Sequence, residues 1–348
     1  MSKKDFANSF KIFMCCVGTI IGAGFASGQE IKSFFVQYGE RGAIGIIICG
    51  LLFFWYVYTV LKKIYIYNIR DFRGYFSDLA GKHTVGFIEM ISYAFMLASF
   101  VVMVAGSGAV AEQLFGGNVF GILFMATLCF VVFLKGVDGM VAVNAVMTPL
   151  IIAGIAIIGT LSLFGDGEVF SNFNKSKAID NFFVSALVYV SYNTITLIGV
   201  LLPLKDKITS KAVAWGGAFF SGVLLLIVGL TLWSVIYIYK SDIINVQVPM
   251  LYIAEKNGVI AKYLYSAVLY MAMITTAVSS GFAFLSFLKR HVKIGNTVAS
   301  ALVCTLSVPL SFIGFADLVN KLYRFFGFIG MFVLIMVLID GLRCKSLC

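Results

Sequence analysis

The sequence predicts an all-α polytopic membrane protein whose ten transmembrane helices form two sets of five. Three observations support this fold class. Of the 348 residues, 61% are hydrophobic and only 12% are charged, which is about half the charged fraction of a typical soluble domain. Apolar runs long enough to cross a bilayer recur from one end of the chain to the other. The first five runs and the last five also begin at matching intervals.

The composition excludes soluble proteins and nucleic-acid binders. A soluble domain of this length would have to cover its surface with charged side chains, and the 26 basic and 16 acidic residues are too few. The net charge of +10 does not mark a nucleic-acid site, because the basic residues lie almost entirely between the apolar runs. The seven cysteines do not suggest a disulfide framework, since five of them lie within apolar runs.

Breaks at polar or glycine-containing positions divide the chain into ten spans, each of roughly 20 residues or more. The spans are 10–36, 42–61, 86–114, 118–135, 140–164, 181–203, 212–239, 262–288, 294–313 and 318–341. The first span imitates a cleavable secretory signal, with small residues at Ala26 and Ser27. Its polarity continues through Glu30 and a second span begins within a few residues, so we expect the segment to be retained.

The distribution of basic residues predicts the orientation. With the amino terminus in the cytoplasm, inside segments hold 17 of the 26 Lys and Arg residues and outside segments hold 8, with Lys32 inside the first span. Positive charge gathers on the cytoplasmic side of membrane proteins. We therefore expect a multi-pass protein of a bacterial-type cytoplasmic (plasma) membrane, with both termini in the cytoplasm and a single membrane domain over 1–348.

The spacing of the spans indicates an internal repeat. Spans six to ten begin roughly 170 to 178 residues after spans one to five. Because five is odd, the second set must cross the membrane in the opposite sense, which is typical of secondary transporters. The repeats are then 10–164 and 181–341. Ten spans of similar length can produce similar offsets by chance, but the long connections 62–85 and 240–261 correspond as well.

The first span predicts a broken helix. Gly18, Gly22, Gly24 and Gly28 fall within eleven residues, and each glycine weakens a helix by roughly 1 kcal/mol relative to alanine. Unwound backbone at the midplane is tolerated only where it faces protein or a watery cavity. The alternative is a close helix contact, because Gly24 and Gly28 form a GxxxG pair.

The sixth span carries five polar side chains within six residues, from Ser191 to Thr196. Such groups are costly at mid-membrane unless they face a cavity or one another. Corresponding interruptions in two halves point to a transport site, so we expect spans one and six both to break at the midplane. The candidate solute-binding residues are Gly22, Ala23, Gly24, Phe25, Ser191, Tyr192, Asn193 and Thr194.

Each candidate has an expected role. Free amides at a broken helix end favour anions and free carbonyls favour cations. The amides near Gly22–Phe25 would meet a solute carboxylate, while carbonyls and the polar side chains of span six would meet an amine. Tyr192 is a candidate aromatic gate. Glu30 is a possible gate as well, although a charged residue toward a span end is more often explained by snorkelling or a local ion pair.

The eighth span offers oxygen ligands. Thr276, Ser279 and Ser280 stand at i, i+3 and i+4 and share one helix face. Hydroxyls on this face, together with carbonyls of the broken first span, would suit a small hard cation. The alternative is ordinary hydrogen bonding of these hydroxyls to their own helix.

The run Gly18–Ile31, GTIIGAGFASGQEI, resembles the YkvI-type membrane proteins of the amino acid/polyamine/organocation (APC) superfamily. The resemblance implies the five-plus-five inverted repeat of LeuT. In sodium-coupled relatives of this fold, one sodium binds between helices one and eight. The matching positions are the carbonyls of Gly18, Ile21 and Thr276 and the hydroxyls of Ser279 and Ser280. Proton-coupled relatives can carry a lysine in helix five; the fifth span has none, which favours Na⁺ as coupling ion.

Together these observations predict a secondary active transporter, not an enzyme, that couples sodium to a small organic solute such as an amino acid or amine. No Walker A sequence or catalytic constellation is present, so we expect no cofactor besides Na⁺. The expected partners are the solute, sodium and the bilayer, and the sequence is compatible with a monomer. One alternative is an amino-acid-sensing receptor subunit of the same fold, of the spore-germination type; an ion channel is another. The segment 246–258 is a candidate re-entrant lid.

Overall fold

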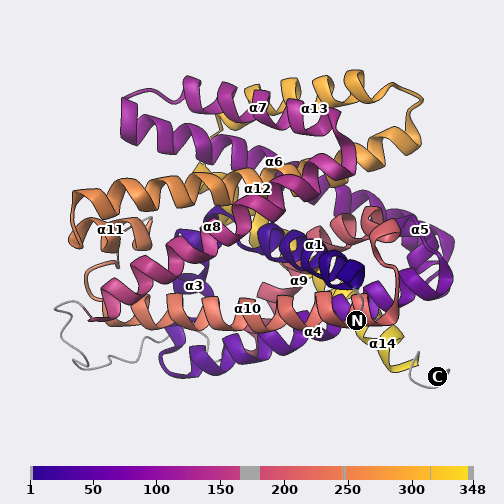
Figure 1. The fold of residues 1–348 in the computed structure, drawn as a ribbon, viewed down its shortest axis with the longest axis horizontal. Coiled ribbons are helices and arrows are strands. Elements are labelled where there is room, and N and C mark those ends of the chain that lie inside the picture. The colour runs from indigo at the N-terminus through magenta and orange to yellow at the C-terminus, as the bar shows by residue number, and fades with distance from the viewer. Residues whose placement is uncertain (1–2, 165–180, 245, 247, 314, 344–348) are drawn as a thin grey trace.

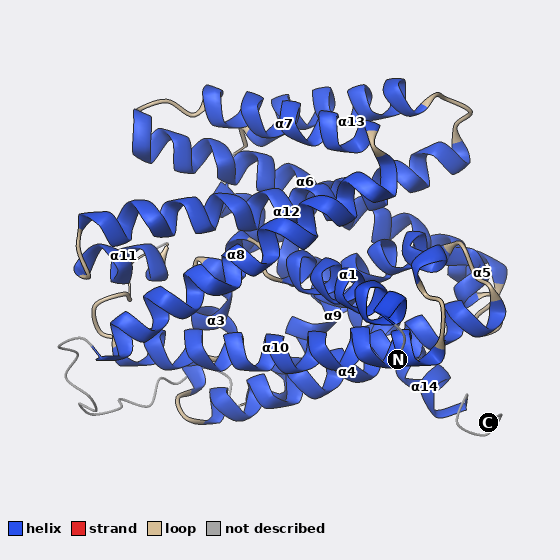
Figure 2. Cartoon of the chain, in the orientation of Figure 1, coloured by secondary structure: helices blue, strands red, loops and turns tan. Residues whose placement is uncertain are grey.

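The computed structural model describes residues 3–164, 181–244, 246, 248–313 and 315–343, and this part of the chain is helical without strands (Figure 2). The α-helices are α1 (Lys3–Ile20), α2 (Ala23–Ala26), α3 (Gln29–Phe34), α4 (Arg41–Tyr67), α5 (Phe72–Phe76), α6 (Lys82–Phe115), α7 (Val119–Leu134), α8 (Gly136–Phe164), α9 (Phe182–Leu201), α10 (Lys211–Ile238), α11 (Pro249–Lys256), α12 (Val259–His291), α13 (Asn296–Ser311) and α14 (Phe315–Arg343). Two 3-10 helices, η1 (Val36–Tyr38) and η2 (Leu202–Lys207), follow α3 and α9.

Every predicted span overlaps at least one helix, but the helices differ in length and polarity. Among the described residues, seven are long and apolar enough to cross a membrane: α4, α6, α8, α9, α10, α12 and α14. Helices α7 and α13 are apolar but have only 16 residues each. Helix α1 carries several charged residues in its first half. Seven helices thus meet this standard, where the sequence predicts ten spans.

Helices of the first half pack against helices of the same order in the second half. Helix α1 contacts α9, α4 contacts α10, α6 contacts α12, and α7 contacts α13. Figure 1 shows α4 beside α10 along one edge and α7 beside α13 along the other. Other contacts also occur in matched pairs, such as α1 on α12 with α9 on α6, and α4 on α9 with α10 on α1. A two-fold relation between the halves would produce such reciprocal contacts.

The glycine-rich run interrupts the helix of the first span. Helix α1 ends at Ile20, Gly22 is extended with φ −88° and ψ −171°, and the four-residue α2 begins at Ala23. A further turn separates α2 from α3. The segment 10–36 therefore holds the second half of α1, the short helices α2 and α3, and the start of η1 rather than one helix. Glycines weaken a helix, and Thr276 closely approaches the backbone at Gly22.

The break predicted in the sixth span is wrong at the residues that suggested it. Helix α9 is continuous through Ser191–Thr194 and passes into η2 only at Leu202. Three of the five polar side chains, Ser191, Asn193 and Thr194, bond to their own helix. Ser191 Oγ donates to the Leu187 carbonyl at 2.6 Å. Asn193 Nδ2 donates to the Tyr189 carbonyl at 2.9 Å. Because these groups are satisfied within the helix, their polarity does not require an interruption.

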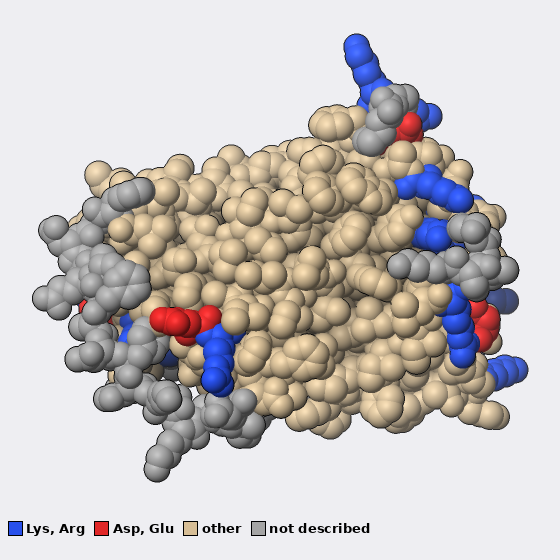
Figure 3. Space-filling view, turned by 90° about the horizontal axis from the view of Figure 1, so that it is seen from below, with Lys and Arg blue, Asp and Glu red and all other residues tan. Residues whose placement is uncertain are grey.

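The two termini lie at the same end of the molecule, together with α5, while α11 lies at the opposite end (Figure 1). On the face shown in Figure 3, Lys and Arg side chains gather toward the ends, most of them at the end of the termini, and a broad uncharged belt separates the two groups. Such a belt suits the hydrocarbon core of a bilayer. Three residues counted in the orientation argument lie outside the described part of the chain: Lys175, Lys177 and Lys345.

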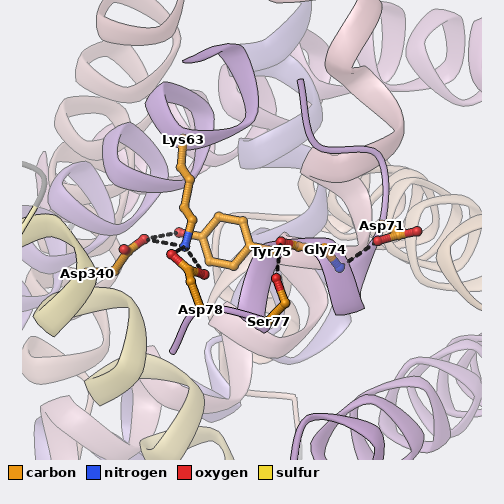
Figure 4. A network of polar contacts seen from close by, with 7 residues as sticks. All are labelled: Lys63, Asp71, Gly74, Tyr75, Ser77, Asp78 and Asp340. Atoms are coloured by element: carbon orange, nitrogen blue, oxygen red, sulfur yellow. Dashed lines mark hydrogen bonds and ion pairs between the residues drawn. The ribbon is translucent and has the colours of Figure 1, made fainter. Parts of the chain in front are cut away.

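A buried charge network joins α4, α5 and α14 near the end of the termini. The Lys63 ammonium lies 2.9 Å from Asp78 and 3.1 Å from Asp340. It also lies 4.6 Å from the centre of the Tyr75 ring, whose hydroxyl donates to Asp340 at 3.4 Å (Figure 4). The side chain of Lys63 is 3% exposed and that of Asp340 is 5% exposed, whereas Asp78 is largely in solvent. The buried Lys63–Asp340 pair therefore ties the two long helices together.

The segment predicted as a re-entrant lid forms the short helix α11. Its first turn reaches the interrupted first span, because the Met250 amide donates to the Ser27 carbonyl at 3.0 Å. Helix α11 also packs against α12 and α8. The segment therefore lies beside the break, with residue 247 outside the described part of the chain.

Candidate functional site

A small polar cavity lies beside the interruption between α1 and α2. It has room of about 20 Å³ for the centres of water molecules, enough for about one ordered water. Its walls come from α1, α3, α6, α9 and α12. The lining residues are Thr19, Ile20, Gly22, Glu30, Phe95, Ser99, Tyr192, Asn193, Thr196 and Thr276. Buried hydroxyl, amide and carboxyl groups thus converge where the helix is broken.

The cavity brings together part of the predicted set. Gly22, Tyr192 and Asn193 line it, as do the candidate gate Glu30 and the cation-site residue Thr276. Phe25 instead lines a separate, apolar cavity with Phe35, Cys49 and Phe53. The remaining solute-binding candidates are buried but do not contribute to the polar cavity: Ala23, Gly24, Ser191 and Thr194.

Five lining residues were not among the predicted site residues: Thr19, Ile20, Phe95, Ser99 and Thr196. Thr196 stands at i+3 from Asn193 and i+4 from Tyr192, so helical spacing alone places these three on one face. Thr19 sits inside the glycine run. Phe95 and Ser99 are also four residues apart on α6, but nothing in their local sequence distinguishes them from other residues of an apolar span.

A cluster of aromatic rings surrounds Tyr192, which lines the cavity with Phe95. The Tyr192 ring lies 5.5 Å from that of Tyr189, 5.9 Å from Phe34 and 6.4 Å from Phe95, measured between centroids. Tyr189 also meets Phe35 at 5.1 Å. These rings join α3 to α9 and α6, and the role of Tyr192 as a gate stays a prediction.

The predicted cation-site residues lie where α1, α8 and α12 meet. Thr276 Oγ1 donates to the Gly18 carbonyl at 3.3 Å and lies 3.4 Å from the carbonyl oxygen of Thr19. Ser280 Oγ donates to the Thr276 carbonyl at 2.6 Å. Ser279 Oγ accepts a hydrogen bond from Asn144 at 3.1 Å. The side chains therefore gather beside the end of α1, and Ser280 makes the helix-internal bond that was the alternative interpretation.

Asn144 on α8 is the residue that sequence reasoning missed in this cluster. It is fully buried, and its Nδ2 donates to the Met140 carbonyl as well as to Ser279. Its Oδ1 has no hydrogen-bond partner among the described residues. This oxygen faces Gly18 so closely that a Cβ added there would lie 2.1 Å away. A single asparagine in the apolar fifth span has no sequence pattern that marks it as a ligand.

The cluster supplies neutral oxygens rather than charged ligands. The described residues contain no group of three or more His, Cys, Asp or Glu able to hold a metal ion. Hydroxyl, amide and carbonyl oxygens are nevertheless the ligands that hard cations prefer. Oδ1 of Asn144 is one such oxygen, and it accepts no hydrogen bond from the described residues. The residues present therefore fit a small hard cation.

Comparison with known proteins gives two relatives from Bacillus subtilis and no matching family model. The uncharacterized membrane protein YkvI is 25% identical over 343 residues, covering 95% of this chain and 94% of that protein. The uncharacterized protein YyaD is 21% identical over 335 residues, covering 96% of this chain and 97% of that protein. The resemblance to YkvI inferred from the run Gly18–Ile31 is thus confirmed.

Solved structures of transporters share the arrangement of helices. A Na⁺-coupled sialic acid symporter matches with a TM-score of 0.67 at 13% identity, covering 94% of this chain and 78% of that one. MhsT in complex with L-phenylalanine matches with a TM-score of 0.64 at 14% identity, covering 93% of this chain and 87% of that one. Mhp1, a nucleobase-cation-symport-1 family transporter, matches with a TM-score of 0.57 at 15% identity, covering 92% of this chain and 74% of that one. The chain has the LeuT fold. LeuT-fold transporters bind solute and ions beside discontinuous helices at the repeat interface, and the polar cavity of this chain lies beside such an interruption.

Proposed function

We propose that this chain is a secondary active transporter that moves a small organic solute, such as an amino acid or amine, by alternating access and with sodium as the coupling ion. The observation that carries the proposal is the polar cavity at the interruption of the first span in a LeuT fold. The names of the neighbours add support, since one is called Na⁺-coupled and another binds L-phenylalanine.

The proposed architecture has ten spans in a five-plus-five inverted repeat, 10–164 and 181–341. The reciprocal packing of α4 on α10, α6 on α12 and α7 on α13 supports it. The short helices α7 and α13 would then cross a thinner or locally adapted bilayer. We place both termini in the cytoplasm of a bacterial-type plasma membrane, because the end that carries them also carries most of the basic side chains on the face in Figure 3.

The proposed solute site is the cavity and its immediate backbone. Gly22, Tyr192 and Asn193 line it directly. The backbone of Ala23, Gly24 and Phe25 continues the same interruption, and Ser191 and Thr194 are buried neighbours on α9. Because the cavity has room for only about one water, we take this conformation as closed. Access from either side then requires α2 and α3 to move relative to α6 and α12.

The proposed sodium site combines the carbonyls of Gly18, Ile21 and Thr276 with the hydroxyls of Ser279 and Ser280. The contact of Thr276 with the Gly18 carbonyl supports it by bringing α1 and α12 together. A hydroxyl that donates to a carbonyl still has lone pairs for a cation. The amide oxygen of Asn144 is the further ligand that the structure suggests for this set.

Uptake into proteoliposomes tests the proposal. Purified protein would be reconstituted into liposomes, and each of a panel of amino acids and amines would be supplied outside them. Uptake would be compared under an inward sodium gradient and an equal choline gradient. We expect saturable uptake of at least one compound that needs the sodium gradient. Specific binding without flux under any gradient would instead identify a receptor, and flux that does not saturate would identify a channel.

A further inference from the structure

The polar cavity contains one acidic side chain and no basic one. Of its ten lining residues, Glu30 alone carries a carboxyl group, and none is Lys, Arg or His. Glu30 is only 6% exposed. A buried carboxylate is tolerated when a cation or a set of strong donors compensates its charge. The groups around Glu30 therefore decide what the cavity can hold.

No basic side chain compensates Glu30 among the described residues. Lys32, the nearest cation in sequence, turns away: its ammonium donates to the carbonyls of Ile243 at 2.6 Å and Ile244 at 2.8 Å. The hydroxyls of Tyr189 and Tyr192 face the Glu30 carboxyl. Oε2 of Glu30 still makes no hydrogen bond of ordinary geometry within the described part of the chain. The local ion pair weighed in the sequence analysis is thus absent from these residues.

Gly24 holds the carboxyl at the cavity. A Cβ added to Gly24 would lie 2.1 Å from Glu30 Oε1 and 2.7 Å from Cδ. The carboxyl therefore packs directly on the backbone of α2, two residues after the extended Gly22. Any other side chain at position 24 would displace it, which gives a way to move the charge without removing it.

Aromatic rings form the wall beside this carboxyl. Phe95 and Tyr192 line the same cavity, and their ring centroids are 6.4 Å apart. Aromatic rings and a carboxylate together favour an organic cation, because the ring face attracts positive charge and the rings pack against the carbon atoms of the solute. A bare metal ion gains less from such a wall than from the hydroxyl and carbonyl cluster around Thr276 and Ser279.

We propose that Glu30 is the counter-ion for a positively charged nitrogen on the solute, so that the cavity selects small solutes with an ammonium group. The inference rests on the proposed transport function for its cargo, but it concerns binding and can be tested without flux. A solute ammonium would donate to the carboxyl oxygens and lie against the rings of Phe95 and Tyr192. A solute lacking that charge would leave Glu30 buried and uncompensated, which disfavours its binding.

The test measures ligand-induced thermal stabilisation of the full-length protein in detergent. The probes are amino acids and short alkyl amines, each paired with its N-acetylated form, which keeps the carbon skeleton and removes the charge. We expect at least one amine to stabilise the wild-type protein and its acetylated form not to do so. Stabilisation by acetylated or purely anionic probes alone would overturn the proposal.

Variants then assign the effect to Glu30. In Glu30→Gln we expect the affinity for the amine probe to fall by about 100-fold or more, as for a buried ion pair that loses one partner. Gly24→Ala should weaken the binding of the same probe, because the added Cβ displaces the Glu30 carboxyl. Glu112→Gln is the matched control, since Glu112 is an exposed carboxyl on α6 away from the cavity.

Sodium provides the check on folding and on the ion. Glu30→Gln should retain the stabilisation that sodium chloride gives over choline chloride, which shows that the variant is folded and that its cation site is intact. Loss of the sodium effect with unchanged amine affinity would assign Glu30 to the ion and contradict the proposal. Amine affinity within threefold of wild type in Glu30→Gln would contradict it as well. Amine binding without flux would instead remove the transport function and leave the role of Glu30 standing.

Discussion

The Nδ2 atom of Asn144 donates a 3.1 Å hydrogen bond to Ser279 Oγ and so joins α8 to α12. The same asparagine presents an unpartnered Oδ1 to Gly18 on α1. Three helices thus meet at one amide group, where the proposed sodium ligands gather. This geometry makes Asn144 a direct probe of the cation site.

Replacing Asn144 with alanine should lower the apparent affinity for sodium by about 10- to 100-fold, the usual effect of losing a group that orients a metal ligand. It should also destabilise the protein by about 1 to 3 kcal/mol, because Ser279 loses a buried hydrogen bond. Sodium titrations of thermal stability and of uptake check both effects. Thr160→Val is the control, since Thr160 is exposed on the same helix. An unchanged sodium titration in Asn144→Ala would place the ion elsewhere.

The double replacement Ser279→Ala and Ser280→Ala should abolish the dependence of uptake on sodium. Both hydroxyls are buried, so their loss removes two ligands without changing the surface. Ser286→Ala offers a matched control, because Ser286 lies on the same helix and donates only to the Phe282 carbonyl at 2.9 Å. We expect Ser286→Ala to behave like the wild type. Sodium dependence that survives the double replacement would contradict the assigned ligands.

Gly22 and Thr276 should be energetically coupled. A Cβ at Gly22 would lie 2.7 Å from Thr276 Oγ1, so Gly22→Ala should destabilise the protein by about 1 to 3 kcal/mol, as overpacking does. Adding Thr276→Ala removes the clashing oxygen and should recover part of that loss. A double-mutant cycle of unfolding free energies measures the coupling. Strict additivity of the two changes would show that the side chains do not meet.

The Lys63 network predicts an asymmetry between its two acids. Lys63→Met leaves the buried Asp340 carboxylate without its basic partner, with the Tyr75 hydroxyl still donating to it, and should destabilise the protein by about 3 to 5 kcal/mol. Asp78→Asn should change stability by no more than about 1 kcal/mol, because the Asp78 side chain is 58% exposed. Thermal unfolding of the two variants separates these values. Equal effects would mean that the exposed acid, rather than the buried one, holds Lys63.

Hydropathy and glycine content predicted much of the fold, and the sixth span shows their limit. Both interrupted-looking spans place polar or small residues at mid-membrane, but only the first breaks at the predicted place. Glycines weaken the helix itself around Gly22. Ser191 and Asn193 instead bond to carbonyls one turn back in a helix that stays intact. Polarity alone therefore does not distinguish a broken helix from one whose side chains are satisfied internally.

The candidate site was only partly visible in the sequence for a related reason. Tyr192, Asn193 and Thr276 belong to dense polar clusters that attract notice. Asn144 and Ser99 are single polar residues in apolar spans, and their importance arises from packing against α12 and the cavity. Such contacts join residues more than a hundred positions apart, so local pattern does not report them.

Coupled movement of the two substrates tests the central claim most directly. In proteoliposomes with equal sodium on both sides, an inward gradient of a transported amine or amino acid should drive radioactive sodium inward. The flux should disappear in the Ser279→Ala, Ser280→Ala double variant and persist in Ser286→Ala. Solute entry without any accompanying sodium movement in the wild-type protein would contradict sodium-coupled transport.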